Sequence, residues 1–299
     1  MADLLAPGHR GCAGCPASIC VRQVLDAAGP NTICTNATGC LEVMTTPYPE
    51  TAWKVPWAHS AFENSAAMAS GIEAAYKALN RRNGTNKKPN IIAFAGDGGT
   101  FDIGLQALSG ALERGHRMLF VCYDNEAYMN TGIQRCSSSP IGAWTTTSPE
   151  GSCSSGKTQR KKPIAMIAAA HDIPYVATAC ISYPQDLKAK VKKALSFDGP
   201  SFLHVFAPCP TGWRFPSEKT IAMGKLAVET GVFVLYEMTD AEPMKPIVTV
   251  KPKEFRPVEE YLQAQGRFAH LFKPKRDEVT LKRIQEDVDR KLKWVGLKP

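Results

Sequence analysis

The sequence contains no long hydrophobic segment and no visible export signal. No apolar run approaches 18 residues, so we expect no transmembrane helix. The first ten residues, MADLLAPGHR, lack a charged segment followed by a long apolar one, so we expect no secretory signal. These absences favour a cytoplasmic protein with no membrane partner. Its thiols would stay reduced, so disulfide bonds are a poor explanation for its ten cysteines.

The sequence also lacks a G-x-G-x-x-G motif, which disfavours a nicotinamide cofactor, and it shows no internal repeat. Positive charge is in excess, with 36 Lys and Arg against 28 Asp and Glu, a net charge of +8. Much of it lies in the runs RKKP (160–163), KAKVKK (188–193) and 273–285. A solvated surface and a platform for an acidic partner or anionic cofactor both explain these runs. We expect no nucleic-acid partner.

Helical and strand patterns alternate along the first two thirds of the chain. Helices are predicted at residues 16–29, 63–79, 101–115, 163–171 and 184–195, and strands at 31–40, 91–99, 117–128, 175–182 and 201–209. This alternation predicts an α/β, doubly wound, mostly parallel sheet with sites at the carboxyl ends of its strands. We expect this domain to span 1–235. Residues 236–299 look extended and then helical, and are expected to be an arm that packs on partner subunits.

A glycine-rich motif, GDGG, ends the strand predicted at residues 91–99. The carboxylate of Asp97 is expected in the crevice above the sheet, where Gly96, Gly98 and Gly99 let backbone N–H groups approach a ligand. The helix predicted from residue 101 would direct its positive end to the same place. A divalent cation bridging a carboxylate and a phosphate would explain this combination. The alternative is a glycine turn capped by aspartate.

A second polar segment, YDNEAYMNTG (123–132), begins where the next strand is predicted to end. Asn125 follows Asp97 by 28 residues (125 − 97), and it could supply an amide oxygen to the same cation. The carbonyl of Ala127 could supply another, leaving diphosphate and water to complete a magnesium octahedron. This combination of GDG and a later asparagine resembles the motif of thiamine-diphosphate enzymes.

Four cysteines are expected near the same crevice. Cys40, in NATGC, and Cys209, in HVFAPCPTGW, lie at predicted strand ends, and Cys12 and Cys15 form a C-x2-C pair just before a predicted helix. Four such thiolates suit a [4Fe–4S] cluster or tetrahedral zinc, and their spacing leaves both open. The other six are interpreted as buried packing residues, least securely those in the long loop 136–163: Cys20, Cys34, Cys122, Cys136, Cys153 and Cys180.

The chain resembles, over nearly its whole length, the thiamine-diphosphate-binding β subunit of the 2-oxoacid:ferredoxin oxidoreductases, most closely the branch that acts on pyruvate. The resemblance is carried by GHRGCAGC, NATGCLEV, PYPETAWKVPWAHSAFENSAAMASGIEAA, GDGGTFDIGLQALSGALERG, NEAYMNTGIQ and GPSFLHVFAPCPTGWRFP, among other segments. It implies the thiamine-diphosphate-binding fold. Pro16 and Ala17 depart from the family's usual glycine and glutamate; the lost charge and lost N–H donor would shift a cluster potential in opposite directions.

The resemblance also implies roles for individual residues. The cluster ligands are Cys12, Cys15, Cys40 and Cys209, and the magnesium ligands are Asp97, Asn125 and the backbone oxygen of Ala127. Asn130 matches a catalytic residue near the reacting centre. Further residues belong to segments that line the cofactor: Thr38, Gly39, Cys40, His59, Gly96, Gly98, Gly99 and Thr131. His59 taken alone also fits a structural role.

The implied activity is oxidative decarboxylation of pyruvate with coenzyme A, giving acetyl-CoA and CO2 and passing electrons reversibly to ferredoxin. The implied cofactors are thiamine diphosphate, Mg2+ and a [4Fe–4S] cluster. The implied partners are α, γ and δ subunits or fused equivalents, and the glutamate that activates thiamine would come from the α subunit. Two alternatives remain: the same chemistry on oxalate or a branched 2-oxoacid, and a zinc-stabilised non-redox thiamine enzyme or binding module.

Overall fold

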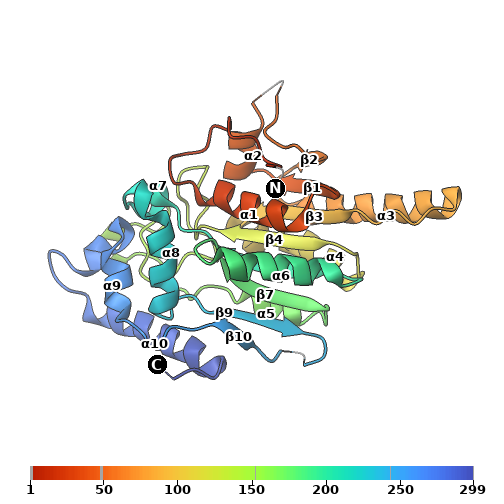
Figure 1. Cartoon of the computed structure of the whole chain (residues 1–299). Coiled ribbons are helices and arrows are strands. Elements are labelled where there is room, and N and C mark those ends of the chain that lie inside the picture. Colours follow the sequence, from red (N-terminus) through yellow and green to blue (C-terminus); the bar gives the residue numbers. More distant parts are fainter. Residues whose placement is uncertain (1–2, 48–49, 152, 243, 299) are drawn as a thin grey trace.

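The computed structural model describes residues 3–47, 50–151, 153–242 and 244–298. The strands of its main sheet are β1 (Thr32–Ala37), β2 (Trp57–Ser60), β3 (Asn90–Gly96), β4 (Leu119–Asp124), β7 (Tyr175–Cys180), β8 (Ser201–Phe206), β9 (Leu235–Thr239) and β10 (Ile247–Val250). Their order is β10-β9-β7-β8-β4-β3-β1-β2 (Figure 1). The strands from β7 to β2 pair in parallel, and β9 and β10 extend the sheet antiparallel. The predicted mostly parallel α/β sheet is confirmed.

Helices cover both faces of this sheet. On one face lie α1 (Pro16–Ala28) and α6 (Pro184–Ser196), and on the other α3 (Ser65–Asn83), α4 (Leu105–Glu113) and α5 (Ile164–Ala169). Along β3, Ile92 and Phe94 pack into the first layer and Ala93 and Ala95 into the second. Because both faces are buried, the strand reads as a continuous apolar run, as expected for a parallel sheet between helices.

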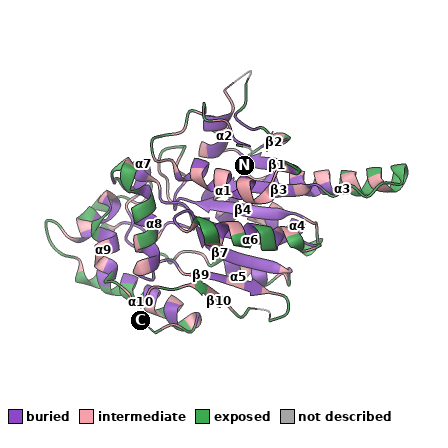
Figure 2. Ribbon diagram, in the orientation of Figure 1, coloured by how far each residue is buried: buried purple, intermediate pink, exposed green. Residues whose placement is uncertain are grey.

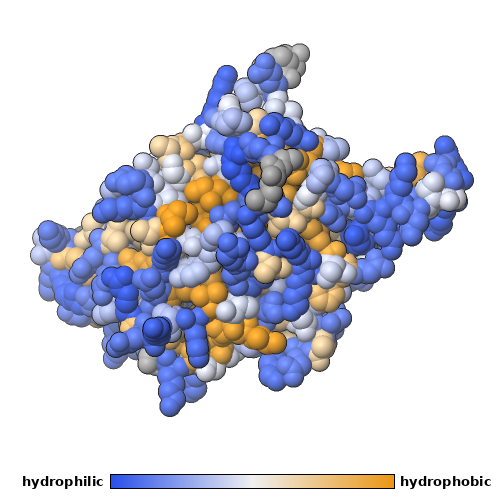
Figure 3. Space-filling view, in the orientation of Figure 1, coloured by the Kyte–Doolittle hydropathy of each residue, from blue (hydrophilic) through white to orange (hydrophobic). Residues whose placement is uncertain are grey.

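The longest of these helices, α3, extends beyond the edge of the sheet (Figure 1). Its first half packs on the sheet through Ala66 and Ala69, whereas its second half is largely exposed (Figure 2). The projecting half is mostly hydrophilic (Figure 3). None of the helices in the described ranges combines the length and apolar character that a membrane span requires.

The C-terminal third adds helices to one end of the sheet. These are α8 (Thr220–Glu229), α9 (Val258–Gln263) and α10 (Glu278–Trp294), with a 3-10 helix at Gly266–Leu271. They enclose a third core that includes Phe206 and Trp213. The β9 strand, which crosses the predicted boundary at residue 235, pairs with β7 in the main sheet. Packing of residues 236–299 on partner subunits stays a prediction.

Several element ends differ from the predictions. The strand predicted to residue 209 ends at Phe206, and Pro208 and Pro210 beyond it have no N–H for a ladder hydrogen bond. The strand predicted to residue 128 ends at Asp124, two residues before Glu126, which has φ +64°. The helix predicted from residue 101 is replaced by a π-helical turn at Gly98–Asp102, and α4 follows from residue 105.

Candidate functional site

The polar residues predicted around the cofactor lie at the carboxyl ends of β1, β3 and β4, three neighbouring strands. One cavity is lined by predicted residues from all three strand ends, together with Phe62, Tyr123, Tyr128 and Met129. The predicted residues lining it are Thr38, Gly39, Cys40, Gly96, Asp97, Gly98, Gly99, Asn125, Ala127, Asn130 and Thr131. His59 is exposed outside this lining, with Nε2 at 2.8 Å from Thr38 Oγ1.

Three oxygen-bearing groups converge at this site. Asp97 is 1% exposed, and its Oδ1 accepts a hydrogen bond of 3.3 Å from the backbone N–H of Asn125. One end of the Asn125 side-chain amide lies 3.0 Å from Asp97 Oδ1 and 2.9 Å from the carbonyl oxygen of Ala127. With its nitrogen turned to these oxygens, the amide donates to both. With its oxygen turned to them, three acceptors meet, which requires a cation between them.

The glycines of the GDGG motif are held by close packing. A Cβ at Gly98 would lie 2.2 Å from Cε1 of Tyr128, and a Cβ at Gly99 would lie 3.1 Å from the carbonyl oxygen of Phe62. The Thr100 hydroxyl donates to the carbonyl of Gly96 at 2.7 Å and supports the turn. A larger residue at position 98 would therefore displace the Tyr128 ring from the cavity wall.

A cysteine interpreted from sequence as a packing residue contacts Asp97 directly. Cys136 is 1% exposed, and its thiol donates to Asp97 Oδ2 at 2.7 Å. Burial, followed by the nearby Asp124 carboxylate, raises the pKa of Asp97 well above its usual range. A bound cation would favour the ionised carboxylate. Nothing in the local sequence around Cys136 indicates this contact.

Behind the site lies a buried ion network that the sequence did not predict. Asp124, fully buried, accepts from Ser138 Oγ at 2.6 Å and lies 2.6 Å from His204 Nε2 and 2.5 Å from Lys161 Nζ. Lys161 also pairs with Glu126 at 2.8 Å. Despite the burial of Asp124, the lysine holds the pKa of its carboxyl below the usual range. In the RKKP run, Lys161 therefore belongs to the interior, contrary to both sequence interpretations.

The four predicted cluster cysteines are brought together beside the cavity. Cys15 immediately precedes α1, Cys40 is the first residue of α2 (Cys40–Thr45), and Cys209 immediately precedes α7 (Pro210–Trp213). The pKa of Cys40 is raised to about 12. The largest cause is burial, followed by the nearby thiols of Cys209, Cys15 and Cys12 in that order. Mutual influence of this kind requires the thiols to be neighbours.

The backbone around these cysteines has special requirements. The C-x2-C turn is closed by the N–H of Cys15, which donates to the carbonyl of Cys12 at 3.1 Å. Within it, Gly14 has φ +69°, and a Cβ there would lie 2.3 Å from the carbonyl oxygen of Ser217. Pro16 occupies the first turn of α1, as predicted. Among the described residues, no three His, Cys, Asp or Glu side chains are arranged around a single metal ion.

Five of the remaining six cysteines are buried, as the packing interpretation predicts, although Cys136 also contacts Asp97. Cys20, Cys34, Cys122, Cys136 and Cys180 are buried, and Cys153 is exposed.

Asn130 and Tyr123 connect the cofactor cavity to the cysteines. The side chain of Asn130 lies near Cys40 and opposes the rise in the Cys40 pKa. Tyr123 is 2% exposed, and its hydroxyl has no hydrogen-bond partner among the residues that the structure describes. This hydroxyl lies 3.5 Å from the position of a Cβ on Gly39 and 3.7 Å from one on Gly96. Sequence reasoning missed Tyr123, since an aromatic residue at a strand end also fits ordinary core packing.

The chain is similar to known proteins over most of its length. Residues 37–205 match the family model described as "Thiamine pyrophosphate enzyme, C-terminal TPP binding domain". Pyruvate synthase subunit PorB of Methanocaldococcus jannaschii is 61% identical over 297 residues, covering 99% of this chain and 97% of that protein. PorB of Thermotoga maritima is 53% identical, covering 96% and 89%.

Two further similarities are more distant. Ketoisovalerate oxidoreductase subunit VorB of Pyrococcus abyssi is 47% identical, covering 96% of this chain and 88% of that protein. A solved 2-oxoglutarate:ferredoxin oxidoreductase from Magnetococcus marinus superimposes with a TM-score of 0.58 at 22% identity, covering 70% of this chain and 67% of that one, and shows the shared fold. From the near full-length identity to the PorB proteins and the matched thiamine pyrophosphate domain, the chain belongs to the family of pyruvate synthase PorB subunits, within the thiamine-diphosphate-dependent 2-oxoacid:ferredoxin oxidoreductases.

Proposed function

We propose that this chain binds thiamine diphosphate, Mg2+ and a [4Fe–4S] cluster as a subunit of a pyruvate synthase. The complex would convert pyruvate and coenzyme A to acetyl-CoA and CO2, with electrons passing reversibly to ferredoxin. The observation that carries this proposal is the convergence of Asp97, Asn125 and Ala127 oxygens beside four neighbouring cysteines.

The spacing of these groups is compatible with magnesium. Two ligands at right angles on Mg2+, each at 2.0–2.1 Å, lie about 2.9 Å apart, whereas Ca2+ ligands would lie about 3.3 Å apart or more. The inward end of the Asn125 amide lies 3.0 Å from Asp97 Oδ1 and 2.9 Å from the Ala127 oxygen. Asp97 supplies the one carboxylate of this set, which leaves positive charge for a diphosphate. The residues therefore fit a magnesium diphosphate.

The unpartnered hydroxyl of Tyr123 supports a diphosphate in the same cavity. A buried hydroxyl without a partner costs about 1–3 kcal/mol, and an anionic ligand would remove that cost. The hydroxyl lies between Gly39 and Gly96, which belong to the two segments predicted to line the cofactor. Thr38, Gly98, Gly99 and Thr131 are proposed to line the cofactor with them, and His59 to orient Thr38.

The resemblance to the 2-oxoacid:ferredoxin oxidoreductases, rather than the cysteine geometry, favours a [4Fe–4S] cluster over zinc. Four thiolates on one zinc ion, each at about 2.3 Å, need sulfur atoms roughly 3.8 Å apart. Cluster thiolates bind separate iron atoms and need not converge on one point. Cys12, Cys15, Cys40 and Cys209 influence one another electrostatically, which supports a single metal group shared by all four. A zinc-stabilised non-redox enzyme or binding module is the alternative that the test below addresses.

The chain's own residues would bind and orient these groups. When bound, thiamine diphosphate would supply an electron sink for the loss of CO2, and a cluster held by the four cysteines would supply a one-electron acceptor. The Asn130 amide lines the cofactor cavity and lies near Cys40, which supports a role in contact with both groups. We therefore assign Asn130 the catalytic role of holding the reacting substrate beside the cluster.

Pyruvate is the favoured substrate. The PorB proteins are 61% and 53% identical to this chain, against 47% for the VorB protein. Identity at 47% keeps a branched 2-oxoacid as the second candidate, and oxalate remains a weaker one. The partners would be α, γ and δ subunits or fused equivalents, with ferredoxin as electron acceptor and a cytoplasmic location. Residues 236–299 are proposed to pack on those subunits.

The proposal is tested on the complex purified without oxygen. We expect a broad absorption near 400 nm, roughly as for iron–sulfur proteins in general, with iron, sulfide and magnesium bound to this chain. A colourless chain with stoichiometric zinc would refute the redox assignment. Turnover of pyruvate, 2-oxoisovalerate and oxalate, each with coenzyme A and ferredoxin, then ranks the substrates, and a preference for 2-oxoisovalerate would replace pyruvate.

A further inference from the structure

A second cavity, of about 320 Å³, lies between the sheet and α10. This volume is within the range of roughly 300–1,000 Å³ that is usual for small-molecule sites. Its wall is mainly apolar and comes from separate elements, including Ile164 from α5, Phe233 before β9, and Ile284, Val288 and Trp294 from α10. None of these side chains lines the cofactor cavity. Glu126 lines this cavity, and its chain neighbours Asn125 and Ala127 line the other.

The deep end of the cavity carries charges that are already neutralised. Glu126 and His204 are 3% and 6% exposed, and Lys161 pairs with Asp124 and Glu126. Arg267 adds a second cation to Glu126 at 2.6 Å. Because these charged side chains are paired with one another, the deep end offers no uncompensated charge that would bind a charged group of a ligand. An occupant would place its apolar body here.

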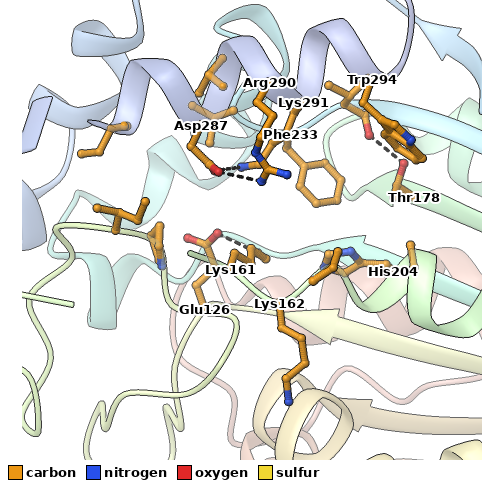
Figure 4. A pocket seen from close by; sticks show the side chains of 18 of the residues that line it. Glu126, Lys161, Lys162, Thr178, His204, Phe233, Asp287, Arg290, Lys291 and Trp294 are labelled. Carbon is orange, nitrogen blue, oxygen red and sulfur yellow. Dashed lines mark hydrogen bonds and ion pairs between the residues drawn. The ribbon is translucent and has the colours of Figure 1, made fainter. Parts of the chain in front are cut away.

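The outer end has an excess of positive charge. Arg290 and Lys291, both from α10, line the cavity and contact Asp287 at 2.9 and 2.8 Å. Arg160 contacts the same carboxylate at 3.3 Å. One carboxylate thus faces three cations, whose side chains remain 32–57% exposed. Figure 4 shows Asp287, Arg290 and Lys291 on the side of the cavity opposite Lys161 and Glu126.

We propose that this cavity binds a small carboxylate with an apolar body, the body inside and the carboxylate beside Arg290 and Lys291. The apolar wall would favour a hydrocarbon body, since burial contributes about 25 cal/mol per Å² of apolar surface. The excess of two positive charges around Asp287 selects an anion over a neutral or cationic ligand of the same body. The site is separate from the cofactor cavity, and its occupancy does not depend on thiamine diphosphate.

The test measures octanoate binding by calorimetry, with octanol as a ligand of the same chain length without the charge. We expect octanoate to bind at least ten times more tightly than octanol, to the full chain and to the assembled complex alike. The double variant Arg290→Gln/Lys291→Gln should weaken octanoate binding at least tenfold. Lys293→Gln, an exposed lysine of the same helix outside the lining, is the matched control and should leave it unchanged.

A variant that fills the cavity, Val288→Trp, should abolish binding. If it fails to fold, the glutamine variants still test the proposal, because their side chains are partly exposed. Four results would overturn it: no octanoate binding, equal affinity for octanol, equal loss in the Lys293 variant, or binding to the isolated chain but not to the complex. The last result would show that a partner subunit covers the cavity.

Discussion

Replacing Tyr123 with phenylalanine should affect stability and cofactor binding in opposite directions. The Tyr123 hydroxyl is buried and, within the described part of the cofactor-free chain, has no hydrogen-bond partner. Phenylalanine keeps the ring, which packs with Ile92, Phe94 and Val121, and removes only the hydroxyl. The free chain should therefore become more stable, whereas a diphosphate that accepts from this hydroxyl should bind more weakly.

The two magnitudes follow from the same hydroxyl. Leaving a buried polar group unpaired costs about 1–3 kcal/mol, which the substitution Tyr123→Phe would remove from the folded state. A hydrogen bond to a charged acceptor contributes about 1.5–3 kcal/mol, which corresponds to roughly a 10- to 150-fold loss in affinity for thiamine diphosphate. Thiamine without phosphates should bind equally well to both forms.

Calorimetric titration and thermal unfolding provide the assay, and Tyr175→Phe is the matched control. The Tyr175 hydroxyl is also buried, but it donates to Glu237 at 2.7 Å on the far side of β8 from the site. Its removal should lower stability and leave cofactor affinity unchanged. If Tyr123→Phe lowers the stability of the free chain, or binds thiamine diphosphate as the parent does, the hydroxyl has another partner and the reasoning fails.

Three further predictions follow from the site. Cys40→Ser should abolish the absorption near 400 nm, whereas the control variant Cys34→Ala, at a buried cysteine outside the proposed ligands, should keep it. If both variants kept the absorption, Cys40 would not be a ligand of the cluster. Asp97→Asn should weaken Mg2+ binding at least tenfold. It should also raise the stability of the metal-free chain, because a buried charge is lost. Calorimetry measures both quantities, and an unchanged Mg2+ affinity would contradict the assignment. Burial lowers the pKa of Lys157 to about 8; since its folded pKa lies below the unfolded value of about 10.4, stability should rise between pH 8 and 10. Lys157→Met should remove that increase, and an identical pH profile would show that another group causes it.

The sequence predicted the sheet and the convergence of Asp97 and Asn125 because both depend on local pattern; that these residues bind a metal stays a proposal. Alternating helices and strands imply a parallel sheet, and a parallel sheet brings the carboxyl ends of its strands to one edge. Asp97 and Asn125 follow neighbouring strands, so their convergence required no knowledge of loop geometry. Local pattern alone could not predict that the cysteines lie together, because Cys12, Cys15 and Cys209 lie on loops whose paths are determined by tertiary packing.

The residues that were missed lack a local pattern of their own. The RKKP run has the composition of a solvated surface, yet Lys161 is fixed by Asp124 and Glu126, 37 (161 − 124) and 35 residues earlier. Cys136 lies in a loop without periodicity and contacts Asp97 only because that loop folds over the strand ends. In each case the partner is distant in sequence, so composition could not identify the contact.

The C-terminal segment helps to place the proposed metal oxygens, even though none of its residues is a predicted ligand. Glu126, at φ +64°, separates Asn125 from Ala127, and this conformation is costly for a residue with a side chain. Arg267 pairs with Glu126 at 2.6 Å, and its guanidinium lies 3.7 Å from the centre of the Trp213 ring. Trp213 Nε1 in turn donates to the carbonyl oxygen of Asn125 at 2.8 Å. Because this chain of contacts holds the loop at both Asn125 and Glu126, Arg267 from the segment 236–299 helps to position the loop that carries the oxygens.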